Sequence, residues 1–442
     1  MSTPAADTVR PTLIDRVFGI RSGEFAAAAW SFALFFCVLS SYYILRPVRE
    51  SMGVKSGPDT LQWLFMASFV AMCAITPVFG WIVARFPRRT FLPWVYFFFI
   101  VNILAFWAAF SVALARDWDF VWLARVFFVW VSVFNLFVVS VFWSFMADIY
   151  TREQCRRLFG PISAAGSIGA GVGSVATGLL VVHIGFQNVL PIAAALLLIA
   201  VLCILRLRGW VESFADVAHR EAATSRRPLG GNPFSGVTHV FSSKYFSNIS
   251  IASIIASLLG TALYIFTAKL VETAIPGSNE NVQYYAIVNL AIVALAGFGQ
   301  LFVLRHMVHR FNIGISLVLL PIVSIVGFIL LAFEPTLAAV SILTVVRRGL
   351  GFAFSKPTTD MLYSVVTTEE KYKTKNFIDT TVYRFGDIVG SSTIHGFITL
   401  GLSIPPISFI MVPFGAVWAG ISLWLGRDYR DRARRLKEVG IK

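Results

Sequence analysis

The chain has 442 residues, of which 57% are hydrophobic and 14% are charged, and its mean hydropathy is +0.75. A soluble domain with so little polar surface would aggregate, so the composition excludes an ordinary soluble protein. The net charge of +14 would suit a nucleic-acid-binding protein, but the basic residues recur between apolar segments, where they act as topology signals and face anionic lipid.

Twelve apolar segments follow one another along the chain, and each is long enough to cross a bilayer. Because backbone amides in lipid must be hydrogen-bonded within their own segment, each stretch of roughly 20 apolar residues predicts a transmembrane helix. The expected fold is therefore an all-α multi-pass membrane protein with twelve spans. These are residues 24–45, 60–84, 91–115, 120–147, 161–182, 186–207, 246–273, 282–304, 312–333, 336–363, 376–400 and 404–426.

Every second connection between the predicted spans is basic. The basic residues on this side are Arg85, Arg88, Arg89, Arg152, Arg156, Arg157, Arg305, Arg310, Lys371, Lys373 and Lys375. The segment 1–23 and the tail 427–442 fall on the same side, so the positive-inside rule places both termini in the cytoplasm. The first segment shows no secretory signal pattern, and a bacterial inner membrane is the expected location. Arg46, Arg49 and Lys55 are an exception, because the predicted spans leave them in an outer connection.

A polar stretch divides the twelve spans into two sets of six. This layout is typical of transporters built from two bundles that are related by pseudo-two-fold symmetry. Weak internal similarity supports the division, because residues 42–50 and 264–272 each carry a tyrosine, then a base, then an acid. The expected units are a cytoplasmic segment 1–23, a first bundle 24–207, a linker 208–245 with a surface helix from Phe234 to Phe246, a second bundle 246–426 and a basic tail 427–442.

The connection between the second and third spans resembles a known signature. Residues 80–89 read GWIVARFPRR, similar to the G-x-x-x-D-R-x-G-R-R of the major facilitator superfamily, with Ala84 and Pro87 as departures. The resemblance implies a loop that latches the two halves on the cytoplasmic side through charge contacts. The expected gating residues are Arg85 and Arg88, with Asp148 at the inner end of the fourth span as a partner.

The tenth span carries two adjacent arginines in its apolar stretch. An ionisable side chain in hydrocarbon costs roughly 2.5–3.5 kcal/mol on insertion scales, so each one needs a partner or a wet cavity. Arg347 and Arg348 lie about 17 Å from the outer start of the span, near the midplane, at 1.5 Å per residue. They have no acid nearby in the sequence, which favours a cavity and an anionic ligand, since the planar guanidinium binds carboxylate or phosphate bidentately.

Other intramembrane charges leave two interpretations open. Lys356 and Asp360, and likewise Arg384 and Asp387, are spaced to share a helix face, so each pair either joins helices as an internal ion pair or takes part in binding and coupling. Arg46, Arg49 and Lys269 also leave two interpretations open, because each side chain either extends to the outer membrane interface or binds an anion. Pro47 is expected to break the first span there and to expose backbone groups beside the two arginines.

The chain lacks the patterns of membrane-embedded enzymes. No phosphate-binding G-x-x-x-x-G-K-[ST] loop, no Ser-His-Asp set and no paired-carboxylate arrangement is recognised. None of the four cysteines is placed for a disulfide or a zinc site, and His306 and His309 lack neighbouring carboxylates. We therefore expect no enzyme, no cofactor and no metal, and transport driven by exchange or by an ion gradient.

Three segments resemble the bacterial and plastid ATP/ADP translocase family. They are LRPVRE at 45–50, NPF at 232–234 and EKYKTKNFID at 370–379, similar to the family's L-R-x-x-K-D, its surface-helix start and its E-x-K-Y-K-x-K-x-x-I-D. The resemblance implies a major-facilitator-like fold and exchange of ATP for ADP, with Arg49 and Glu50 at the family's Lys and Asp positions. Where the family has G-K-S-G-G, this chain has an acid, Asp387, which favours a proton-coupled or differently charged solute.

The first hypothesis is a secondary transporter that moves an anionic, phosphorylated solute, ATP and ADP among the candidates, by alternating access. Its expected substrate-binding residues are Arg46, Arg49, Lys269, Arg347, Arg348, Lys356 and Arg384, and its coupling or gating residues are Glu50, Asp148, Asp360, Asp387, Arg85 and Arg88. The alternative is a proton-coupled major facilitator exporter of amphipathic or cationic compounds, and a third hypothesis is a non-transporting scaffold. The expected partners are the solute and anionic lipid, with no nucleic acid, and the protein is expected to be a monomer.

Overall fold

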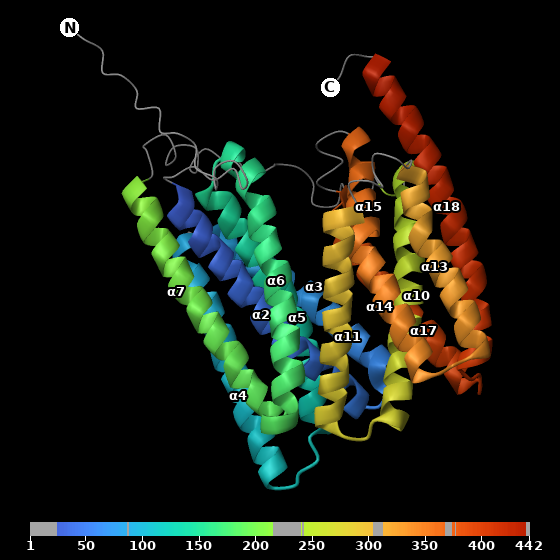
Figure 1. The fold of residues 1–442 in the computed structure, drawn as a ribbon, viewed down its shortest axis with the longest axis horizontal. Helices are drawn as coiled ribbons and strands as arrows, with labels where there is room; N and C mark the ends of the chain where they lie inside the picture. Colours follow the sequence, from blue (N-terminus) through green and yellow to red (C-terminus); the bar gives the residue numbers. More distant parts are fainter. Residues whose placement is uncertain are drawn as a thin grey trace.

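The computed structural model describes residues 24–85, 88–214, 240, 243–303, 313–366, 374–375 and 377–438. These residues form long helices that stand in two groups side by side (Figure 1). The first group holds α2 (Phe25–Lys55), α3 (Leu61–Arg85), α4 (Arg88–Ala115), α5 (Val121–Ile149), α6 (Arg152–Ile184) and α7 (Leu190–Phe214). The second holds α10 (Lys244–Ala274), α11 (Ser278–Phe298), α13 (Ile313–Phe333), α14 (Leu337–Leu350), α15 (Lys356–Leu362), α17 (Tyr383–Thr399) and α18 (Ile404–Glu438).

The predicted all-α architecture is confirmed, because each of the twelve predicted spans coincides with a helix. In the tenth span, α14 and α15 are joined by the π-helical segment Gly351–Ser355, and in the eleventh the π-helical segment Ile378–Val382 leads into α17. Eleven helices of the described chain are long and apolar enough to cross a membrane. The segment with α17 is not one of them, since it carries Asp379, Arg384 and Asp387.

The predicted break at Pro47 is wrong. Helix α2 continues through this proline to Lys55, because proline removes only one backbone hydrogen bond and helices in membranes re-satisfy the freed group locally. Arg46 and Arg49 therefore lie on the first span rather than in an outer connection. Arg46 is only 7% exposed, so it does not snorkel to the interface.

Several helices extend beyond their predicted spans. Helix α7 runs to Phe214 and α10 begins at Lys244, so Tyr245 and Phe246 belong to α10 rather than to a surface helix. Residues 234–239 of that expected helix lie outside the described residues. The tail predicted from residue 427 is helical through Glu438 at the end of α18.

Close backbone contact joins α2 to α6 inside the first half. A Cβ atom at Gly173 would lie 2.5 Å from the carbonyl oxygen of Ser40, so only glycine permits this approach. Nearby, the hydroxyl of Ser40 donates to the carbonyl of Gly169 at 3.0 Å. At the other end of α2, the carboxylate of Glu24 accepts two bonds, of 3.0 and 2.9 Å, from the guanidinium of Arg157 on α6. Helices α2 and α6 are thus fastened together along their length.

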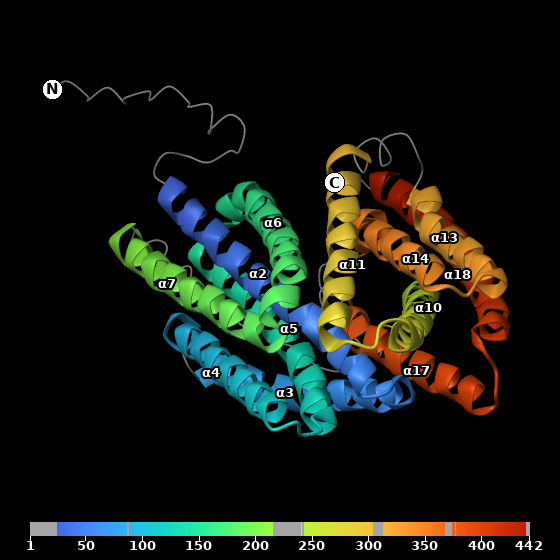
Figure 2. The same cartoon turned by 60° about the horizontal axis from the view of Figure 1, so that its bottom comes forward.

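Polar contacts join the two halves at the end of the molecule opposite the termini. The hydroxyl of Ser51 donates to the carbonyl of Ser278 at 3.3 Å, and the amide of Phe186 donates to Oδ1 of Asn279 at 2.9 Å. The two groups converge at this end and diverge towards the end that carries the termini (Figure 1). In the turned view, α4 and α7 lie on the outer side of the first group and α13 and α18 on the outer side of the second (Figure 2). Across the interface, α2 and α6 pack against α11, and α3 packs against α17. The side-chain amide of Gln283 on α11 also donates to the carbonyl of Gly178 on α6 at 3.2 Å.

The α2–α6 contact predicts a position-specific effect on stability. Gly173→Ala forces the backbones of α2 and α6 apart and should destabilise the protein by about 1–3 kcal/mol, the usual cost of overpacking. Gly171→Ala on the same helix is the matched control, because a Cβ there meets nothing within 4 Å. Thermal unfolding of the purified protein measures both. Equal melting temperatures for the two variants would contradict the close contact.

Candidate functional site

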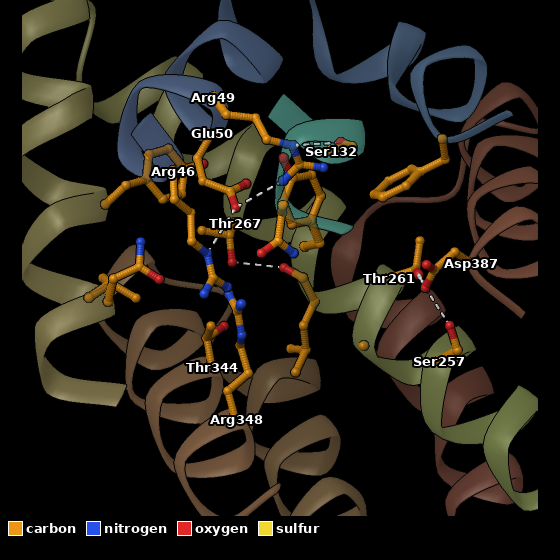
Figure 3. A pocket seen from close by; sticks show the side chains of 18 of the residues that line it. Arg46, Arg49, Glu50, Ser132, Ser257, Thr261, Thr267, Thr344, Arg348 and Asp387 are labelled. Atoms are coloured by element: carbon orange, nitrogen blue, oxygen red, sulfur yellow. Dashed lines mark hydrogen bonds and ion pairs between the residues drawn. The ribbon is translucent and has the colours of Figure 1, made fainter. Parts of the chain in front are cut away.

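A cavity of about 260 Å³ lies between the two halves. Its wall comes from α2, α3 and α5 on one side and from α10, α11, α14 and α17 on the other. Five guanidinium groups and two carboxylates line it, which leaves the wall three positive charges in excess. These residues are Arg46, Arg49, Arg347, Arg348, Arg384, Glu50 and Asp387 (Figure 3).

On the α2 side, one carboxylate holds two arginines. Oε1 of Glu50 lies 3.2 Å from Nη1 of Arg49, its neighbour in the chain, and 3.8 Å from Nε of Arg46, which is four residues away on the same helix face. The Arg49 guanidinium also lies 3.9 Å from the centre of the Phe128 ring and donates to Oγ of Ser132 at 3.0 Å. Arg49 is therefore held firmly against α5, whereas the contacts of Arg46 with Glu50 and with the Tyr43 hydroxyl, at 3.4 Å, are long.

On the α14 side, Arg347 is fixed by uncharged partners. Its Nε donates to Oγ of Ser324 at 3.1 Å, and its Nη2 donates to the carbonyl of Ala256. Gly260 leaves room for the guanidinium, since a Cβ there would lie 2.9 Å from Nη1. Among the described residues, no carboxylate is within ion-pair distance of Arg347 or Arg348. The sequence-based expectation that these two cations lack an internal acid is confirmed for this part of the chain.

The arginines of the two halves lie at the same depth. Arg46 is nine residues before the last residue of α2 and Arg347 is ten residues after the first residue of α14, which corresponds to about 14 and 15 Å. Arg46 and Arg348 point toward one another from opposite sides of the cavity (Figure 3). Two like charges facing each other in a partly dry site repel, and an anion between them is the arrangement that electrostatics favours.

The α17 side carries the second carboxylate. Asp387 is 9% exposed and forms an ion pair with Arg384 at 3.2 Å. It also accepts hydrogen bonds from Ser257 and, at 3.3 Å, from Thr261 on α10 (Figure 3). The ion-pair interpretation of Arg384 and Asp387 is therefore confirmed, and both residues line the cavity as well.

The charges nearest the terminal end form a separate network. Nζ of Lys356 lies 3.3 Å from Asp360 on its own helix and 2.7 Å from Asp379 on the segment that enters α17, and Lys375 lies 3.0 Å from Asp360. The predicted Lys356–Asp360 pair is confirmed, and the network extends it between two helices. None of these four side chains lines the central cavity.

The structure does not bring every predicted residue to the cavity. Lys269 lies apart and pairs with Asp59 at 3.4 Å near the outer end of α10. Arg85 ends α3, Arg88 begins α4 and Asp148 lies near the end of α5, but the side chains of residues 77–91 fall outside the described part of the chain. The cytoplasmic latch therefore stays a prediction.

Uncharged residues of the wall were missed by the sequence analysis, which considered only ionisable groups. Two asparagines, one from each half, lie on the lining, together with five aromatic residues: Asn135, Asn289, Tyr42, Phe65, Tyr264, Tyr285 and Tyr383. A signal was present for the asparagines, because a polar amide inside an apolar span needs a partner or a cavity. The aromatic residues gave no signal, since the chain holds 41 phenylalanines and 12 tyrosines.

Residues 25–391 match the family model described as Major Facilitator Superfamily. The chain belongs to this superfamily. Its members are secondary transporters, not enzymes, and the protein is an integral multi-pass membrane protein. The expectation drawn from the loop at 80–89 is thereby confirmed at the level of the superfamily.

More distant similarities agree with this assignment. ADP,ATP carrier protein 2 of Chlamydia pneumoniae is 20% identical, with 94% of this chain and 91% of that protein covered. The crystal structure of the nucleoside transporter NupG superposes with a TM-score of 0.58 at 16% identity, covering 93% of this chain and 99% of that one. A bacterial homologue of the iron transporter ferroportin, in an inward-facing state, gives 0.62 at 10% identity over 92% and 98%. The two structures share the major facilitator fold with this chain.

The Arg384–Asp387 pair predicts a non-additive effect on stability. Arg384→Gln leaves a buried carboxylate without its charge partner and should lower the melting temperature, because an unpaired buried charge costs more than a neutral pair. Adding Asp387→Asn removes that charge and should recover most of the loss. Thermal unfolding of Arg384→Gln, Asp387→Asn and the double variant measures the coupling, and losses that simply add would show that the two groups act independently.

Proposed function

We propose that this major facilitator exchanges anionic, phosphorylated solutes of the nucleotide type across the membrane. The observation that carries the proposal is the charge of the central cavity, where five guanidinium groups face two carboxylates. Arg347 and Arg348 have no carboxylate partner in the described part of the chain, so a phosphate group that enters would meet cations without a competing internal acid. Phosphate suits them, because guanidinium binds it bidentately.

The uncharged lining supports a solute that also carries a ring. Tyr42, Phe65 and Tyr264 offer aromatic faces on one part of the wall, and Asn135 and Asn289 offer amide donors and acceptors. Aromatic faces stack on heterocycles, and amides hydrogen-bond their edges. The distant similarity to an ADP,ATP carrier supports the same choice of solute. A nucleotide would thus place its phosphates among the arginines and its base among these uncharged side chains.

Glu50 partly neutralises the arginines of the cavity when no solute is bound. In the absence of solute, its carboxylate holds Arg46 and Arg49 and weakens their repulsion. A polyanion competes with this carboxylate for Arg46, whose contact with Glu50 is the longer one at 3.8 Å. Arg46 then joins Arg348 around the solute, so one anion bridges the first half to the second.

Bridging both halves provides the driving force for closure. Contacts such as Ser51 to Ser278 hold the two halves together at the end opposite the termini, and the halves diverge towards the terminal end (Figure 1). Closing the terminal end over an empty cavity would desolvate unpaired cations at a cost of several kcal/mol each. A bound polyanion neutralises them, so the loaded carrier changes state readily and the empty one does not. Obligatory exchange follows from this difference. If both termini are cytoplasmic, as the basic connections predict, the open side is the cytoplasmic one.

Uptake of labelled ATP into proteoliposomes tests the proposal directly. Uptake should rise when the vesicles contain ADP and should not depend on an imposed pH gradient, because the anion rather than a proton neutralises the cavity. Empty vesicles without protein supply the control. Uptake that ignores internal nucleotide would contradict exchange.

Arg347→Ala should abolish this uptake while leaving a folded protein, because the variant removes a cation from the cavity and an uncompensated charge from the membrane at the same time. Lys269→Gln is the matched control, since it also removes one cation but lies outside the cavity lining. Size-exclusion profiles confirm folding of both. Near-normal uptake by Arg347→Ala would remove this residue from the proposed site.

Asp387 favours a second candidate, a proton-coupled exporter of cationic or amphipathic compounds. Its carboxylate is buried beside Ser257 and Thr261 on the cavity wall, a position from which an acid can exchange a proton during transport. The excess of guanidinium groups opposes a cationic solute. Transport that follows a pH gradient and is lost in Asp387→Asn would favour this candidate over nucleotide exchange.

A further inference from the structure

A second cavity, of about 510 Å³, lies inside the second half of the molecule. Its wall is formed by α10, α13, α14, α15, α17 and α18, together with the π-helical segment Gly351–Ser355. All of its lining residues in the described part of the chain belong to the second half. It is therefore a pocket within one bundle rather than part of the opening between the two bundles.

The lining of this C-bundle cavity combines charged and large apolar side chains. Lys356 and Asp379 form an ion pair on it at 2.7 Å. Its large apolar side chains are at most 7% exposed, namely Ile249, Leu317, Leu320, Leu362, Trp418 and Leu425. A ligand that matches this lining carries both a charged group and an apolar body.

The C-bundle cavity shares a cationic wall with the central cavity. Arg347, Arg348, Tyr383 and Arg384 line both. Arg384 is engaged by Asp387 and Lys356 by two carboxylates, but Arg348 has no carboxylate partner among the described residues. The uncommitted charge on the lining of the C-bundle cavity is therefore positive, and the complementary ligand is an anion.

We propose that the C-bundle cavity binds an amphipathic anion, a phosphate or carboxylate group joined to an apolar body. The anionic group lies at Arg348, and the apolar body packs on Trp418 and the leucines of the lining. Because Arg348 lines both cavities, an anion held there excludes an anion held by the same arginine in the central cavity. A ligand in the C-bundle cavity thus inhibits binding of the transported solute. This inference goes beyond the proposed function and rests on it only for the identity of the competing solute.

The experiment measures binding of 2-naphthyl phosphate to the purified full-length chain in phosphatidylcholine nanodiscs by calorimetry. This probe combines the two required parts. 2-Naphthol lacks the anion and inorganic phosphate lacks the apolar body, so both should bind at least about tenfold more weakly, the usual effect of losing a charge-assisted hydrogen bond or a buried ring.

Variants assign the binding to one cavity. Trp418 lines only the C-bundle cavity, whereas Arg49 lines only the central one. Arg348→Gln and Trp418→Ala should each weaken 2-naphthyl phosphate binding by about tenfold, and Arg49→Gln should leave it unchanged. Two variants with different chemistry keep the test usable if one of them fails to fold. Equal weakening by Arg49→Gln, or naphthol that binds as tightly as its phosphate ester, overturns the proposal.

Competition separates this inference from the proposed function. Saturating ATP should raise the apparent Kd of 2-naphthyl phosphate in the parent chain, since both need Arg348. Simultaneous binding of both ligands would overturn the inhibitory role. If ATP does not bind at all, the proposed function fails, and the ester and variant measurements still decide whether the C-bundle cavity is a binding site.

The source of the natural ligand is decided by the lipid. Nanodiscs that contain phosphatidylglycerol supply the same phosphate-plus-apolar chemistry from the bilayer. Weaker binding of 2-naphthyl phosphate in these discs than in phosphatidylcholine alone identifies a lipid headgroup as the occupant. Unchanged binding identifies a soluble ester that enters from the open side.

Discussion

Cations without internal partners, held inside a membrane, are the constraint on which the rest of this structure depends. Each such group costs roughly 2.5–3.5 kcal/mol on insertion scales, and Arg347 and Arg348 stand side by side on one helix. The fold meets the cost with uncharged partners. Ser324 and the carbonyl of Ala256 accept from two of the five donors of Arg347, and the cavity leaves the remaining donors accessible to water or to an anion. These partners hydrogen-bond the Arg347 guanidinium without neutralising its charge, so the charge stays available to an anionic ligand.

Because both halves carry arginines that line the cavity, binding of an anionic solute changes the electrostatic force between the two halves. Arg46 belongs to the first half and Arg348 to the second, and they point toward one another. Without an anion their repulsion favours separation of the halves at the open end. With an anion between them the same two charges attract a common centre, so the preferred conformation changes through differential contacts in the two states. Closure needs no other trigger.

Most of the fold was predictable because helix formation in a membrane is a local matter. Hydropathy located all twelve spans, and the basic connections supplied a topology. The prediction at Pro47 was wrong because proline breaks helices mainly in water, where water can hydrogen-bond the freed backbone groups. In a packed membrane helix such as α2 the helical path remains the best one available.

Site residues were predictable in kind but not in pairing. Charges inside spans are costly, so Arg46, Arg347 and Asp387 could be selected from the sequence alone. Which acid meets which base depends on how helices pack, and Lys269 meets Asp59 while Lys356 meets Asp379 across long stretches of chain. Spacing along one helix cannot reveal such partners. The aromatic lining was hidden for the same reason, whereas Asn135 and Asn289 could have been selected as polar amides inside apolar spans.

Because α2 is joined to α6, a movement of α2 at the central cavity also moves the start of α6. Helix α2 is continuous, with Arg46 about two thirds of the way along it and Glu24 at its start, and Glu24 pairs with Arg157. A rod that tilts about its middle moves both ends in opposite directions. A small displacement of Arg46 towards a bound solute therefore also moves the start of α6, because α2 transmits the motion as a rigid helix. The two points are some 30 Å apart at about 1.5 Å per residue.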